Sequence, residues 1–151
     1  MKKKSVRAFA FIQEWGCYPE ETLVVVGTKD PEDFFLLFKK LKVKAGIAIQ
    51  TLKWMKANPM GTDSDNGCFC WVDGPAGRMT ILYLKEWPKK AMWSNYQTLM
   101  HELHHAVDYC LVQARGMEKE KEAQAYAQEM LFEHIRRKLD NLEPHHRINF
   151  V

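Results

Sequence analysis

Apolar residues recur along the chain with two different periods, and each change of period marks a predicted element. Stretches rich in β-branched and aromatic residues at 5–13 and 22–28 predict two short strands. Asp30 is suited to be a helix N-cap, Pro31 suits the first turn, and apolar residues then recur at helical spacing as far as Leu41. The first 41 residues therefore predict two strands followed by a helix.

A second helix and a hairpin are predicted in the middle of the chain. Residues 45–57 have a helical pattern that stops before Pro59. The segment NPMGTDSDNG, residues 58–67, is dense in turn-forming residues and predicts a loop. Residues 68–84 then alternate around the turn DGPAG, which predicts a β-hairpin ending in the strand MTILYL.

Two helices are predicted to complete the chain. The first spans about 96–114, with Ser94 or Asn95 as N-cap and an end near Gly116. The second is long and spans about 118–142. Strands and helices, then a hairpin, then two helices predict an α+β fold, in which a short sheet packs on the first of these helices and the long C-terminal helix follows.

Composition narrows the class of protein. The 151 residues are 46% hydrophobic, which predicts one globular domain over residues 1–151. The net charge is +3 and the only basic run is MKKK at the start, so we expect no nucleic-acid partner. No apolar run is long enough to span a membrane or to form a signal peptide, so we expect a cytoplasmic protein with free thiols at its four cysteines.

The predicted helix over 96–114 carries the motif HELHH at residues 101–105. Positions i and i+4 lie on one helix face, so His101 and His105 can converge on one cation. Glu102 is adjacent and can act as general base toward a metal-bound water. Zinc suits two imidazoles, a carboxylate and an open fourth position. The otherwise apolar helix favours this reading over that of surface histidines.

Two neighbours of the motif have less definite roles. We expect His104 to lie behind the ligands or at the rim of the site. Asp108 lies three residues after His105 and can either orient a ligating imidazole or remain a solvated helix carboxylate.

A third protein ligand is needed, and the last predicted helix offers several acidic residues. Most of them fall on one stripe of the helical wheel, which is typical of a solvent face: Glu118, Glu122, Glu129, Glu133 and Asp140. Glu120 lies about 160° from Glu122, on the apolar side of the helix, where a carboxylate needs a partner. The wheel therefore favours Glu120 over Glu122.

HELHHAVD followed by EKEAQAYAQEML resembles the gluzincin metallopeptidases, and most of all the small phage-type and mobile-element proteins of the repressor-cleaving ImmA/IrrE-like group. Those proteins pair HExxH with a downstream E-x-x-A-[NQ]-x-[FY]-A pattern. The resemblance implies a zinc peptidase that takes a peptide or protein substrate, with Glu120 as third ligand. A second register keeps Glu122 as the runner-up. The likeness covers about 40 residues and does not extend to the first 90.

The implied reaction uses zinc held by His101, His105 and Glu120, with Glu102 taking the proton of the attacking water. Four side chains are candidates for stabilising the oxyanion: Tyr109, Arg115, Tyr126 and His134. By analogy with related peptidases, the strand MTILYL is expected to offer an edge to an extended peptide.

Two other classes of function compete with a peptidase. In a non-catalytic zinc-stabilised interaction module, the metal would supply folding energy, and Cys110 would be the nearest further ligand. A plain helical interaction protein would bind no metal. A general base such as Glu102 has no use in either class.

Overall fold

A computed structural model describes residues 8–60 and 65–142. One mixed sheet of four strands forms the centre of the molecule, in the order β1-β2-β4-β3. Its strands are β1 (Phe9–Trp15), β2 (Tyr18–Val26), β3 (Gly67–Gly74) and β4 (Gly77–Leu84). The pairs β1/β2 and β3/β4 are antiparallel, and β2 and β4 are parallel.

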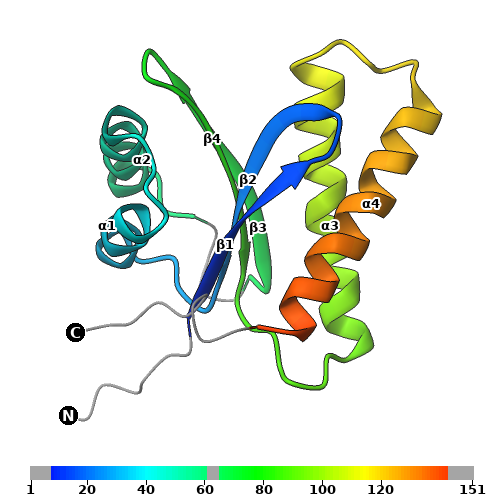
Figure 1. The fold of residues 1–151 in the computed structure, drawn as a ribbon, viewed down its shortest axis with the longest axis horizontal. Coiled ribbons are helices and arrows are strands. Elements are labelled where there is room, and N and C mark those ends of the chain that lie inside the picture. Colours follow the sequence, from blue (N-terminus) through cyan, green and yellow to red (C-terminus); the bar gives the residue numbers. More distant parts are fainter. Residues whose placement is uncertain (1–7, 61–64, 143–151) are drawn as a thin grey trace.

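Helices cover both faces of this sheet. They are α1 (Pro31–Lys40), α2 (Ala45–Ala57), α3 (Trp93–Val107), the π-helical segment η1 (Asp108–Gln113) and α4 (Lys121–Asp140). Figure 1 shows α1 and α2 on one side of the sheet and α3 and α4 on the other. The predicted α+β class is confirmed, with a sheet that packs on the HExxH helix and a long helix that follows.

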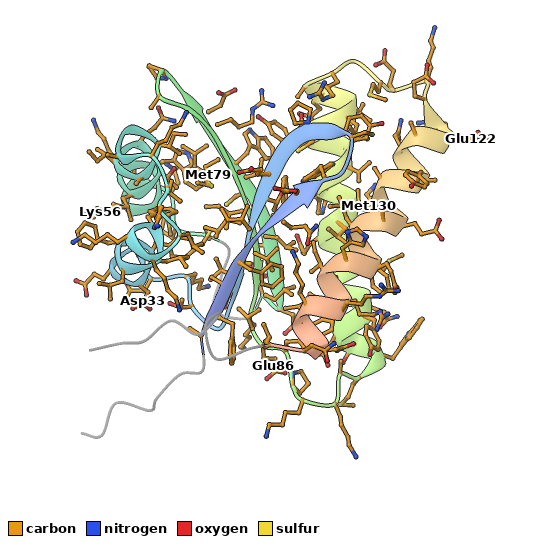
Figure 2. The ribbon with its side chains drawn as sticks, viewed as in Figure 1. Asp33, Lys56, Met79, Glu86, Glu122 and Met130 are labelled. Carbon is orange, nitrogen blue, oxygen red and sulfur yellow. The ribbon has the colours of Figure 1, made fainter. Side chains whose placement is uncertain are left out.

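Strand periodicity sorts the core into two clusters. Alternate β2 residues such as Leu23 and Val25 face α1 and α2, together with Phe34 and Ile81. The intervening residues face α3 and α4, where Leu103 lies in the same cluster as these members: Phe11, Trp15, Val24, Val26, Phe69, Leu82, Leu131 and Ile135. The side chains of Met79 and Met130 lie on these two opposite sides in Figure 2.

The first half of the chain follows the predicted pattern with one extension. Asp30 caps α1 by accepting a hydrogen bond from the Glu32 backbone N–H at 3.0 Å. α2 has the predicted bounds. β2 begins at Tyr18, earlier than predicted, because it pairs with β1 through a turn at Gly16, whose φ of 62° suits glycine. The predicted strand start at residues 5–7 and the loop positions 61–64 lie outside the described residues.

The HExxH helix begins earlier than predicted. Its N-cap is Met92, so the prediction of Ser94 or Asn95 is wrong. Asn95 serves the cap from inside the first turn, since its Oδ1 accepts the Met92 backbone N–H at 2.9 Å. The predicted α-helix also changes to a π-helix at Asp108. None of the helices in the described ranges is long and apolar enough to cross a membrane.

The strand MTILYL is not an edge. It forms most of β4, which pairs with β2 on one side and β3 on the other, so the prediction that it would accept a peptide is wrong. β3 lies at the end of the strand order instead. The edge next to α3 therefore belongs to the first strand of the predicted hairpin.

Candidate metal centre

His101 and His105 converge on the outer face of α3. Their Nε2 atoms lie 3.1 Å apart, and their rings meet edge to face with centroids 4.7 Å apart. Both side chains are exposed. The i, i+4 spacing thus brings one nitrogen of each imidazole close together on the exposed side of the helix, as the sequence predicts.

This separation fits a shared metal ion. Two nitrogens each about 2.05 Å from zinc at a tetrahedral angle are about 3.3 Å apart. The observed 3.1 Å between the two Nε2 atoms is close to that value. His101 and His105 would therefore supply two ligands with little movement of either ring.

Glu102 follows His101 in the chain and is the only buried carboxylate among the described residues, at 7% exposed. It accepts a hydrogen bond from the Phe69 backbone N–H of β3. Burial raises the pKa of Glu102 above its ordinary value, while His101, His105 and the Phe69 N–H oppose that increase. A raised pKa makes the Glu102 carboxylate a stronger base, as a group that takes a proton from water requires.

A glycine allows α3 to approach β3 closely at this point. A Cβ atom at Gly67 would lie 2.9 Å from Thr98 Cγ2 and 3.1 Å from Glu102 Cγ. The contact with Thr98 is shorter than real Cβ atoms show and the contact with Glu102 is tight, so the lack of a side chain at Gly67 makes room for Glu102 at the β3 backbone. The predicted turn region around 58–67 therefore contributes directly to the site.

A shallow polar pocket of about 420 Å³ lies open to solvent beside Glu102. Its lining residues are Asp65, Asn66, Gly67, Gln97, Thr98, His101 and Glu102. The Asp65 carboxylate is close enough to contribute to the raised pKa of Glu102. Sequence reasoning missed Asp65, because a carboxylate in a turn-rich loop has no periodicity that would single it out.

The acidic residues at the start of α4 are placed differently. Glu120 is the N-cap residue of α4 and is exposed, and its backbone carbonyl accepts the Gln124 N–H at 3.0 Å. Glu122 lies on the outer side of α4 in Figure 2, facing away from the sheet. Over residues 8–60 and 65–142, no three His, Cys, Asp or Glu side chains are arranged to hold one ion. Glu120 as third ligand therefore stays a prediction.

The two neighbours of the motif have contacts of their own. His104 is exposed, and its ring centroid lies 6.2 Å from that of His105. Asp108 accepts a hydrogen bond from Gln113 Nε2 at 3.0 Å. That bond closes the π-helical segment η1, so Asp108 contributes to the irregular end of the helix.

Two of the four candidates for stabilising the oxyanion already contact other side chains. Arg115 makes a two-point ion pair with Glu20, with N–O distances of 2.9 and 3.1 Å. Tyr109 is buried and stacks on Trp71. Tyr126 and His134 are exposed on α4.

The chain matches no family model, no curated protein and no solved structure in comparisons with known proteins.

Proposed function

We propose that this chain is a zinc-dependent peptidase in which Glu102 is the general base. The observation that carries this proposal is the convergence of two imidazole nitrogens, 3.1 Å apart, beside a buried carboxylate on the same helix turn. Burying an ionisable group is costly, and such groups cluster at functional sites.

His101 and His105 would hold the ion through their Nε2 atoms. A bound zinc lowers the pKa of water to about 7 and so supplies a nucleophile at neutral pH. Glu102 would take the proton of the attacking water and pass it to the leaving amine. Its contact with the Phe69 N–H fixes the carboxylate at the β3 side of the histidine pair.

The substrate would bind along β3. The Phe69 N–H donates to Glu102, so it points away from β4 and lies on the outer edge of the sheet. Among the described residues, β3 pairs only with β4. An extended peptide that adds to this edge would pass directly beside Glu102, which is the mode called β-augmentation.

Two carboxylates compete for the third ligand position. The family resemblance favours Glu120, which is exposed at the N-cap of α4 and not on its apolar face, whereas the pocket beside His101 contains Asp65. Zinc suits either carboxylate. Zinc affinities of Asp65→Asn and Glu120→Gln, measured with a competing chelator dye, would separate them, because the true ligand is the one whose loss weakens binding.

A non-catalytic zinc-stabilised module is the competing function. Cys110, the further ligand that would have favoured it, is fully buried in the core cluster between the sheet and α3 and α4. It is therefore unavailable to an ion held by exposed histidines.

The decisive variant is Glu102→Gln, with the exposed Glu14→Gln of β1 as the matched control. We expect zinc-loaded wild type and Glu14→Gln to hydrolyse members of a peptide library, and Glu102→Gln to keep its zinc but lose about 10²–10⁴-fold in rate. Equal rates in Glu102→Gln and wild type would remove the general base from the proposal. A zinc-loaded wild type that hydrolyses nothing would favour the interaction module.

A further inference from the structure

Two stacked aromatic side chains, one partly exposed and one buried, lie near the proposed catalytic centre and have no role in the chemistry described above. Trp71 of β3 is 41% exposed, although it stacks on Tyr109 with ring centroids 4.0 Å apart and planes 15° from parallel. Phe69 lies next to both rings, at 6.2 Å from Trp71 and 6.4 Å from Tyr109. Phe69 and Tyr109 are buried, so Trp71 is the exposed ring of these three at the edge of the sheet.

The helix places Tyr109 beyond the histidines on its C-terminal side. Tyr109 follows His105 by four residues and packs inward against Phe69 and Trp71 of β3. At 1.5 Å per residue, Tyr109 is about 6 Å further along the helix than His105. The pair thus borders the histidine site on its C-terminal side.

The geometry of β3 independently places Trp71 at a similar distance from Glu102. Trp71 lies two residues beyond Phe69 on the same face of β3, a step of about 6.7 Å along an extended chain. Glu102 accepts a hydrogen bond from the Phe69 N–H, so its carboxylate lies next to Phe69 at the outer edge of β3. A peptide paired with this edge would therefore present a side chain to Trp71 about two residues from the bond beside Glu102.

We infer that Trp71, backed by Tyr109, forms a specificity subsite for an aromatic side chain of an extended peptide, about two residues from the scissile bond. This inference rests on the proposed peptidase function. It identifies the substrate class as peptides with Phe, Tyr or Trp at one fixed position near the cleaved bond.

The support beneath Trp71 explains the choice of an aromatic side chain. Tyr109 is only 8% exposed, and its ring has the Arg78 guanidinium 5.4 Å from its centre, so it is held in place. Arg78 in turn pairs with Asp73 at 3.5 Å. A fixed indole that is still two-fifths exposed offers a flat apolar surface, and another ring can stack on it without reordering the site.

The experiment is to map cleavage sites in a mixed peptide library with zinc-loaded wild type, Trp71→Ala and Trp93→Ala. Trp93 is the matched control, because it is 74% exposed at the first residue of α3 and is distant in sequence from β3. Trp71→Phe is the rescue variant, since it keeps a ring on Tyr109. Circular dichroism of each variant checks that the fold is retained.

We expect wild type and Trp93→Ala to cleave with aromatic residues enriched at one position near the bond. Trp71→Ala should lower kcat/KM for an aromatic peptide by about tenfold or more relative to its alanine analogue, and Trp71→Phe should restore most of that preference. Cleavage with no aromatic preference, or a preference that Trp71→Ala retains, would overturn the subsite and leave the peptidase standing. No cleavage by zinc-loaded wild type would overturn both.

Discussion

The side of the sheet that faces α1 and α2 is filled by aliphatic, aromatic and sulfur-containing side chains, whereas the side that faces α3 and α4 also buries a carboxylate. Phe34, Leu37 and Met55 are typical of the first side. The second side has a comparable apolar cluster, but Glu102 lies at its margin next to two exposed histidines. Apolar packing alone accounts for the first side, whereas the second also contains an ionisable group, Glu102, whose burial packing does not explain.

The two sides also differ in regularity. α1 and α2 are ordinary α-helices with bounds close to those the sequence predicts. The HExxH helix instead turns into the π-helix Asp108–Gln113, in which the Ala114 N–H reaches the Tyr109 carbonyl five residues back, at 2.9 Å. π-helical turns are rare and occur often at functional sites. The irregular side is therefore the one on which we place the function.

The largest expected effect is on the α1/α2 side. Phe34→Ala removes a fully buried ring and should lower the free energy of unfolding by about 3–5 kcal/mol, measured by chemical denaturation. Zinc affinity of the protein that remains folded should change by less than about twofold, because distant sites act independently. A large loss of zinc affinity would mean that the two sides are coupled through the sheet.

Leu103→Ala is the matching change on the other side. Leu103 is 1% exposed and lies between His101 and His105 in the chain, so its loss should lower the free energy of unfolding by about 2–5 kcal/mol. It should also weaken zinc binding in a competition titration, since the helix that positions both imidazoles loses its packing against the core. Unchanged zinc affinity would contradict that link.

Glu102→Gln should stabilise the metal-free protein. A neutral amide costs less to bury than a carboxylate, and its oxygen can still accept the Phe69 N–H. We expect the Tm at pH 7 to rise by about 2–4 °C, the shift that 1 kcal/mol gives in a domain of this size. The control Glu14→Gln should leave Tm unchanged. A lower Tm in Glu102→Gln would show that the carboxylate stabilises the fold.

The smallest difference between the two sides is expected at their buried thiols. Cys70 on the α1/α2 side and Cys110 on the α3/α4 side each have a pKa raised to about 12 by burial. At pH 8 only about one in 10⁴ of such thiols is ionised, so both should resist alkylation while the exposed Cys17 reacts first. Iodoacetamide labelling followed by mass spectrometry gives the order, and rapid labelling of Cys110 would show that the α3/α4 side opens.

Much of the fold could be predicted because its signals are local. The Asp30 cap, the stop before Pro59 and the DGPAG turn fixed α1, α2 and the β3/β4 hairpin in the predicted places. Strand order could not be predicted in this way. The parallel pairing of β2 with β4 joins residues more than 50 positions apart, and that pairing is what moves the sheet edge from β4 to β3.

The candidate site likewise has a part that could be predicted from the sequence and a part that could not. Helical spacing alone predicted that His101 and His105 converge, and the structure brings their Nε2 atoms together. Gly67, Phe69 and Asp65 could not be found this way, because their place in the site depends on how β3 packs against α3. Long-range packing therefore determines which residues surround the histidine motif, whereas the spacing of the two histidines follows from local helix geometry.

The most direct test of the account is the zinc content of the purified protein by elemental analysis, for wild type beside His105→Ala, Glu120→Ala and Glu122→Ala. We expect one zinc per chain in wild type, loss of zinc in His105→Ala, weaker retention in Glu120→Ala and no change in Glu122→Ala. A wild-type protein that holds no zinc after reconstitution would contradict it and leave the two histidines as a chance pair on a helix surface.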